Sequence, residues 1–74
     1  MEILGSGNYI VLTNMDHGFC KIIVNGSNPL WINKHRLTEA YSLIGDLIRQ
    51  VKRPITYQEV HDLLSQHFLV LEED

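Results

Sequence analysis

The second half of the chain carries the pattern of two amphipathic helices separated by a proline, and this pattern limits the fold more than any other feature. Apolar residues between Leu37 and Val51 recur at the spacing of one helical stripe, which predicts a helix over about 38–52. Pro54 then ends that helix, and Thr56 and Glu59 stand at the spacing of a capping box that begins a second one. Because each helix is apolar on one side only, both need another layer to cover.

The first half of the chain predicts that layer as antiparallel strands. Residues 9–13 and 19–24 are rich in β-branched and aromatic side chains. The Asn-Gly pair at 25–26 is typical of a type I′ hairpin turn, since both residue types tolerate a positive φ. A short third strand is expected over residues 30–32. The apolar stretch 69–71 either ends the second helix or forms a fourth strand, and the sequence leaves this open.

These elements predict a single α+β domain over residues 1–74. We expect a small antiparallel sheet of three or four strands with an N-terminal hairpin, and two C-terminal helices packed on one of its faces. The expected divisions along the chain are a loose N-terminal segment over 1–8, a β-rich part over 9–32, two helices over 37–68 and an acidic tail over 72–74.

Length and composition place the chain among small intracellular proteins. It has 74 residues and a single cysteine, Cys20, which has no partner for an internal disulfide and is expected to be a small core residue. Its first residues lack the basic and apolar pattern of a signal peptide. Its longest apolar runs are far shorter than a membrane span. We therefore expect a cytoplasmic location.

The feature that bears most on function is a surplus of apolar residues on the predicted sheet. A loop over 14–18 would place Thr13 opposite Phe19 and Tyr9 opposite Ile23. One face of this hairpin is uniformly apolar and is assigned to the helices; it contains Ile10, Leu12, Cys20, Ile22 and Val24. The other face is too apolar for simple contact with solvent, and contains Tyr9, Val11, Thr13, Phe19, Lys21 and Ile23.

Two explanations of the second face remain open. An uncovered apolar face usually marks an interface, whereas the N-terminal segment or residues 69–71 would instead cover it internally. The first explanation predicts a non-enzymatic protein-interaction module, such as a regulator, inhibitor or adaptor, which acts through this face or a strand edge. Its partner is another protein or a second copy of the chain, so a homodimer is expected as one form. The predicted contact residues are Tyr9, Val11, Phe19 and Ile23, with Trp31 and Arg36 at the rim.

The main alternative is nucleic-acid binding. Residues 47–60, Leu47 to Val60, resemble the first helix and the following helix start of a winged-helix domain. That resemblance implies a nucleic-acid-binding regulator that uses the basic end of its first helix. The charge pattern supplies a basic strip that could contact the phosphate backbone: Arg36, Arg49, Lys52 and Arg53. Such binding would fall steeply with salt. The net charge of -3 and the acidic surface of the second helix favour the protein-binding hypothesis.

Catalysis, cofactor binding and metal binding are not predicted. A tetrahedral metal site needs four ligands, and His17 and Cys20 have no second pair at the required spacing. His61 and His67 are six residues apart, which separates them around a helix. No base stands at a spacing that would activate Cys20 or a serine as a nucleophile.

Overall fold

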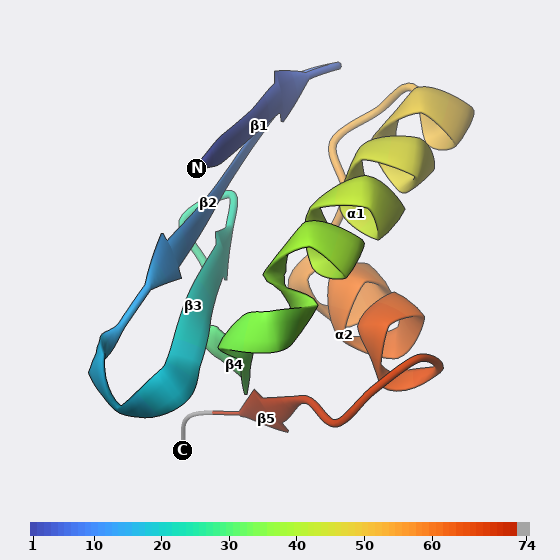
Figure 1. Cartoon of the computed structure of the whole chain (residues 1–74). Coiled ribbons are helices and arrows are strands. Elements are labelled where there is room, and N and C mark those ends of the chain that lie inside the picture. The colour runs from blue at the N-terminus through green and yellow to red at the C-terminus, as the bar shows by residue number, and fades with distance from the viewer. Residues whose placement is uncertain (73–74) are drawn as a thin grey trace.

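The computed structural model describes residues 1–72, apart from the side chain of Asp16, and folds as one antiparallel sheet with two α-helices on one face (Figure 1). Five strands follow one another across the sheet in chain order, and the class is therefore α+β, with one or two strands more than predicted. The strands are β1 (Glu2–Gly5), β2 (Asn8–Asn14), β3 (Phe19–Val24), β4 (Leu30–Asn33) and β5 (Leu71–Glu72). The helices are α1 (Leu37–Val51) and α2 (Tyr57–Ser65), with short 3₁₀ turns η1 (Asp16–Gly18) and η2 (Lys34–Arg36).

The N-terminal segment is a strand, so the prediction of a loose segment over 1–8 is wrong. β1 pairs with β2 in antiparallel fashion from Glu2 opposite Val11 to Gly5 opposite Asn8. Ser6 and Gly7 connect the two strands, and both have positive φ values of 51° and 81°. A two-residue hairpin turn of this kind matches the twist of the flanking strands. Ser6 and Gly7 therefore form a tight turn within the segment that was predicted to be loose.

The segment after α2 also joins the sheet, which decides the alternative that the sequence left open. β5 pairs with β4 through Leu71 opposite Trp31 and Glu72 opposite Leu30. Glu72 is thus part of a strand, which corrects the acidic tail predicted over 72–74; residues 73 and 74 lie outside the described residues. His61 on α2 supports this arrangement, because its Nε2 lies 3.0 Å from a carboxylate oxygen of Glu72.

The hairpin of β2 and β3 has the predicted faces but a different register. Val11, not Tyr9, lies opposite Ile23, and Thr13 pairs with Lys21 instead of Phe19. The register differs by two residues along one strand. Because alternate residues of a strand share a face, a shift of two leaves every side chain on its expected side of the sheet.

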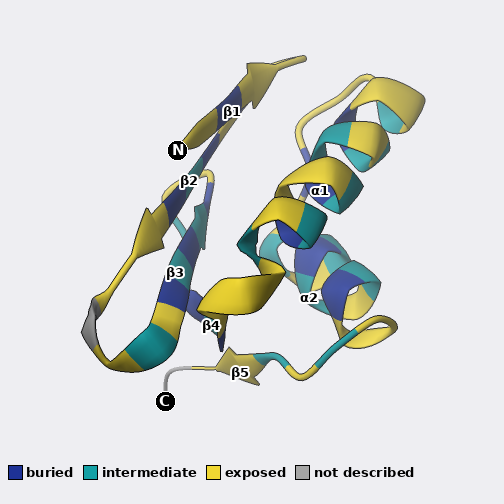
Figure 2. Cartoon of the chain, viewed as in Figure 1, coloured by how far each residue is buried: buried dark blue, intermediate teal, exposed yellow. Residues whose placement is uncertain are grey.

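The core lies between the helices and the sheet face that they cover, as the buried segments in Figure 2 show. The side chains that the sequence assigned to this face are at most 2% exposed: Ile10, Leu12, Cys20, Ile22 and Val24. The helices contribute Ala40, Ile44 and Ile48 from α1 and Val60 and Leu64 from α2. The predicted capping box is present, since Thr56 Oγ1 accepts from the Glu59 amide and the Glu59 carboxylate accepts from the Thr56 amide, both at 3.1 Å.

Two asparagines close one end of the molecule. Asn8 is buried, and its Nδ2 donates to the carbonyl oxygens of Gly5 at 3.0 Å and Arg53 at 2.9 Å. Its Oδ1 accepts from the Ile55 amide at 2.8 Å and from Asn25 Nδ2 at 3.0 Å. Asn25 Nδ2 also donates to the Ile55 carbonyl at 2.9 Å. This asparagine clasp, Asn8 and Asn25, ties the β1–β2 turn and the β3–β4 turn to the linker between the helices.

Candidate functional site

The sheet face turned away from the helices, called here the outer face, is not covered by any element within residues 1–72. Both segments that were candidates to cover it lie in the plane of the sheet instead: β1 extends one edge beyond β2 and β5 extends the other beyond β4 (Figure 1). The strand pairings place seven apolar side chains on this face: Leu4, Tyr9, Val11, Phe19, Ile23, Trp31 and Leu71. The outer face is therefore open as well as apolar.

The predicted contact residues divide between two halves of the outer face. Val11 and Ile23 lie directly opposite each other across β2 and β3, and both are half-buried. Tyr9 belongs to the same half and is 50% exposed. Its hydroxyl donates a hydrogen bond to the Glu2 carboxylate, and this bond together with the charge of Glu2 raises the pKa of Tyr9. Phe19 and Trp31 lie in the other half, beside β5.

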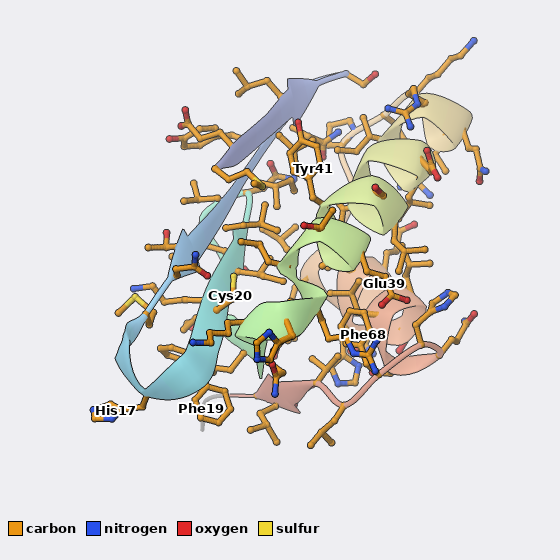
Figure 3. The ribbon with its side chains drawn as sticks, in the orientation of Figure 1. His17, Phe19, Cys20, Glu39, Tyr41 and Phe68 are labelled. Atoms are coloured by element: carbon orange, nitrogen blue, oxygen red, sulfur yellow. The ribbon has the colours of Figure 1, made fainter. Side chains whose placement is uncertain are left out.

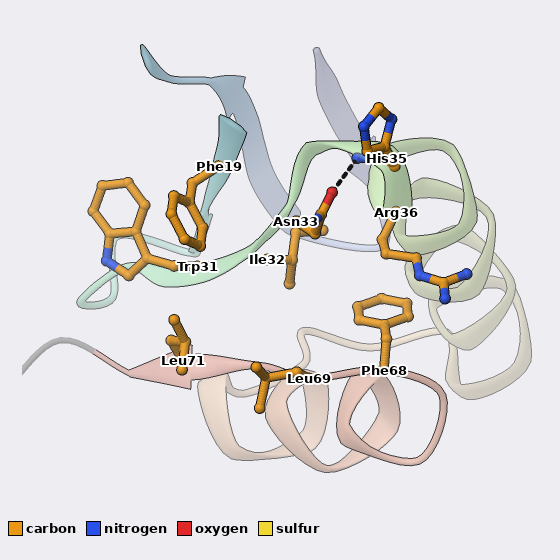
Figure 4. Close-up of a pocket in the computed structure, with 9 residues that line it drawn as sticks. All are labelled: Phe19, Trp31, Ile32, Asn33, His35, Arg36, Phe68, Leu69 and Leu71. Carbon is orange, nitrogen blue, oxygen red and sulfur yellow. Dashed lines mark hydrogen bonds between the residues drawn. The ribbon is translucent and has the colours of Figure 1, made fainter. Parts of the chain in front are cut away.

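The half of the outer face beside β5 is hollowed. A groove with a volume of about 650 Å³ runs between β4 and the segment that leads from α2 into β5 (Figure 4). Its lining includes Phe19, Trp31, Arg36, Phe68, Leu69 and Leu71. A second hollow of about 340 Å³ lies between Phe19, Trp31, Leu71 and Glu72. The two hollows are neighbours that share three of these residues, and together they are called here the furrow.

The furrow exists because β4 is longer than β5. β4 continues through Ile32 and Asn33 beyond its last pair with β5, which joins Trp31 to Leu71. Beyond that pair the two segments diverge, with Phe68 and Leu69 forming the opposite wall (Figure 4). The Leu69 side chain is 76% exposed and Phe19 is 40% exposed, so apolar surface from both walls faces solvent.

Arg36 lies at the end of the furrow nearest the helices. Its guanidinium lies 5.9 Å from the centre of the Phe68 ring, and its Nη1 donates to Glu39 at 3.2 Å (Figure 4). The neighbouring residues of η2 are Lys34 and His35, and all three side chains are exposed. The structure thus brings Arg36 into the same groove as Phe19 and Trp31, away from Tyr9.

The sequence did not identify three exposed leucines of this surface, Leu4, Leu69 and Leu71. Leu4 was missed because residues 1–8 were expected to be loose, and because the adjacent apolar residues Ile3 and Leu4 lack the alternation that signals a half-buried strand. Leu69 and Leu71 were missed because their stretch was left undecided between helix and strand. The alternation of exposed Leu69 and Leu71 around half-buried Val70 fits the extended course that the structure shows.

Three of the four basic residues of the nucleic-acid alternative are engaged in ion pairs. Arg49 pairs with Asp46, and Arg36 pairs with Glu39. Arg53 makes two hydrogen bonds to the Glu59 carboxylate, at 2.8 and 2.9 Å. Lys52 is the C-cap of α1 and has a φ of 53°. The carboxylates beside three of these four cations reduce the positive potential that a phosphate backbone would meet.

The likeness to a winged helix does not extend beyond residues 47–60. A winged helix continues with a recognition helix and a wing, whereas within residues 1–72 α2 is followed by β5, which pairs with β4. Nucleic-acid binding stays a prediction, and it can be tested by the loss of salt-sensitive duplex binding when Arg49, Lys52 and Arg53 are all replaced by Gln.

Other chemical groups do not converge in the described part of the chain. Residues 1–72 contain no cluster of three or more His, Cys, Asp or Glu side chains that could hold a metal ion. Cys20 is fully buried and points toward the helical layer (Figure 3), and this burial raises the pKa of its thiol. A buried thiol with a raised pKa is a poor nucleophile. None of the helices described here combines the length and the apolar character that crossing a membrane requires.

Comparison with known proteins does not assign the chain to a family. No protein-family model matches it, and no curated protein or solved structure is significantly similar to it.

Proposed function

We propose that this chain is a non-enzymatic protein-interaction module that binds its partner through the outer face and the furrow. The observation that carries the proposal is the contrast between the two faces of one sheet. Two helices cover one face, while the other keeps seven apolar side chains and is left open by both terminal strands. Exposed apolar patches of this kind on a small domain mark interaction sites.

The composition of the outer face suits binding more than it suits solvation. Tyr9, Phe19 and Trp31 each present a large ring, and such side chains dominate the binding energy of protein interfaces. Lys21 crosses the face between the two halves, opposite Trp31, and its aliphatic stem can cover apolar surface while its amine stays in water. An interface with aromatic anchors and few charges at its centre is typical of specific complexes.

A photo-cross-linking experiment tests this proposal, because the chain offers a matched pair of aromatic positions. Phe19 and Tyr41 are 40% and 41% exposed, but Phe19 lies in the furrow and Tyr41 on α1 (Figure 3). A photoreactive phenylalanine analogue at position 19 is expected to form a discrete adduct with one partner in the native cell. The same analogue at position 41 should form none. Equal adducts from both positions, or none from position 19, would contradict the proposal.

The native mass in solution distinguishes self-association of the chain from binding to a different protein. Light scattering across a range of concentrations is expected to show whether the chain pairs with itself. If a dimer forms, Ile23→Lys should dissociate it, because Ile23 is at the centre of the outer face opposite Val11. The control Gln50→Lys places the same charge on an exposed position of α1 and should change nothing. A dimer that survives Ile23→Lys would place self-association on another surface.

A further inference from the structure

We infer that the furrow binds an extended peptide segment of another protein, with a bulky apolar side chain at its centre and a carboxylate at the end near Arg36. This inference rests on the proposed function and specifies the chemistry of the partner. Three properties of the furrow support it: the extent of its lining from β5 to η2, its largely apolar lining with basic residues at one end, and the uncovered edge of β4 along one side.

The shape of the furrow fits an extended chain better than a compact small molecule. The groove beside Phe68 and the hollow beside Glu72 share Phe19, Trp31 and Leu71, so the furrow extends from η2 onto the outer face. Its combined lining is dominated by aromatic and leucine side chains, which can contact successive side chains of one strand. Clefts of this volume are common for binding sites, and here the lining residues extend from Trp31 and Leu71 to Arg36 and Phe68 (Figure 4).

The basic end of the furrow defines the polarity of its occupant. Arg36 lines the η2 end of the furrow and Lys34 is its neighbour in η2, so this end is basic, although the chain as a whole has a net charge of -3. At the other end the Glu72 carboxylate is turned toward the helices, where it lies 3.0 Å from Nε2 of His61 on α2. Arg36 can pair with a carboxylate while it remains stacked over Phe68, since its guanidinium offers five donors and Glu39 is bonded only to Nη1. Charge complementarity therefore favours an acidic group at the η2 end.

The edge of β4 offers main-chain recognition along the furrow. Ile32 and Asn33 extend past the last pair of β4 with β5, so no strand of the described chain lies beside them on that side. Extended peptides commonly add to such exposed sheet edges, where main-chain hydrogen bonds provide affinity and pockets for alternate side chains provide specificity. The apolar pocket formed by Phe19, Trp31 and Leu71 adjoins this edge and is placed to receive the central side chain.

Peptide titration tests the inference with a built-in reporter. Trp31 is the single tryptophan of the chain and lines the furrow, so its fluorescence reports on occupancy. The probe is a capped synthetic peptide with glutamate at both ends and phenylalanine, leucine and valine between them. A matched peptide with lysine at both ends provides the comparison. We expect saturable binding of the glutamate peptide, with amide chemical-shift changes confined to β4, η2, residues 68–72 and the start of β3 at Phe19, and at least about fivefold weaker binding of the lysine peptide.

Two arginine variants separate a specific contact from general charge. Arg36→Gln should weaken binding of the glutamate peptide about fivefold and remove its preference over the lysine peptide. Arg49→Gln is the matched control, because Arg49 is also exposed and also pairs with an acidic residue three positions away, but lies outside the furrow. It should leave both affinities unchanged. Leu71→Ser should weaken both peptides by removing apolar contact.

Three outcomes would overturn the inference. These are equal binding of the two peptides, shift changes that map to β1 and β2 instead of the furrow, and binding of sodium dodecanoate as strong as that of the peptide, which would indicate a small amphiphile. The failure of this inference can be distinguished from failure of the proposed function. If peptides do not bind while position 19 still cross-links to a partner, the outer face remains the interface and only the peptide mode is wrong.

Discussion

The two ends of the molecule differ in how far their side chains are paired within the chain. At one end the asparagine clasp joins two turns and the linker between the helices with hydrogen bonds of 2.8–3.0 Å from Asn8 and Asn25. At the other end β4 and β5 separate, and the furrow presents Phe19, Leu69 and Leu71 to solvent. The first end is closed within the chain, while the second leaves apolar area that another molecule can cover.

The difference shows how one small domain can divide stability and binding between its ends. A buried amide whose donors and acceptors are all paired is costly to disturb, because any change leaves groups without partners. An exposed leucine contributes little to the folded state, since most of its surface already contacts water. We therefore expect substitutions at the clasp to act on folding and substitutions at the furrow to act on binding.

The largest effect on stability is expected from Asn8→Ala. It removes the acceptor for the buried Ile55 amide and the donor for the Arg53 carbonyl, so the free energy of unfolding should fall by about 2–4 kcal/mol. Urea denaturation followed by Trp31 fluorescence measures this. The control is Asn33→Ala at the furrow end, where the exposed Asn33 side chain accepts a single bond from the His35 amide. An equal fall in the free energy of unfolding for Asn8→Ala and Asn33→Ala would contradict the expected difference in stability between the two ends.

A smaller loss is expected from Asn25→Gly. Asn25 has a φ of 49°, which glycine adopts without strain, so this variant keeps the turn but removes the side-chain bonds to Asn8 and Ile55. We expect a loss of about 1–2 kcal/mol in the same urea experiment. An unchanged free energy of unfolding would mean that Asn25 matters only for the backbone conformation of the turn. The clasp would then consist of Asn8 only.

The ion pair between Arg53 and Glu59, near the asparagine clasp, makes the stability of the fold depend on pH. Hydrogen bonds from Arg53 and from the Thr56 amide lower the pKa of Glu59 from 4.5 to about 2. Because the folded-state value is the lower one, the stabilisation is complete above pH 4.5 and is lost as the pH falls from 4.5 toward 2. Glu59→Gln keeps a capping side chain but should flatten the stability profile in this range, as measured by urea denaturation at a series of pH values. An unchanged profile would assign the acid sensitivity to other carboxylates.

The smallest effect on stability is expected from Leu69→Ser. Leu69 is 76% exposed, so the free energy of unfolding should change by no more than about 0.5 kcal/mol. In the peptide titration the same variant should lower affinity, because Leu69 forms part of the furrow wall. A destabilisation as large as that of Asn8→Ala would show that the furrow end also supports the fold.

Local patterns allowed much of the fold to be predicted. The capping box at Thr56, the Asn-Gly turn at 25–26 and the helical stripe of α1 depend on residues close in sequence. The two faces of the hairpin were also predicted, because they depend on alternation and tolerate a register shift of two residues. These signals require no knowledge of distant contacts.

The features that were missed depend on partners far along the chain. β5 is a strand only because β4 lies beside it, and its own sequence also fits the end of a helix. Asn8 bonds to residues 45 and 47 positions away, which no local spacing reveals. The furrow combines β3, β4, η2 and the segment before β5, so only Phe19, Trp31 and Arg36 of its lining could be nominated from the sequence.

The brevity of β5 has a consequence for the motion of the sheet. β5 is held to the sheet by two residue pairs, whereas β2 and β3 share five. Local opening costs free energy in proportion to the contacts that break, so β5 should exchange its amide hydrogens orders of magnitude faster than the centre of β3. Since Leu71 and Glu72 form one wall of the furrow, each such opening also changes its width. The strand that completes the sheet is therefore the part of the binding surface that can adjust to the thickness of its occupant.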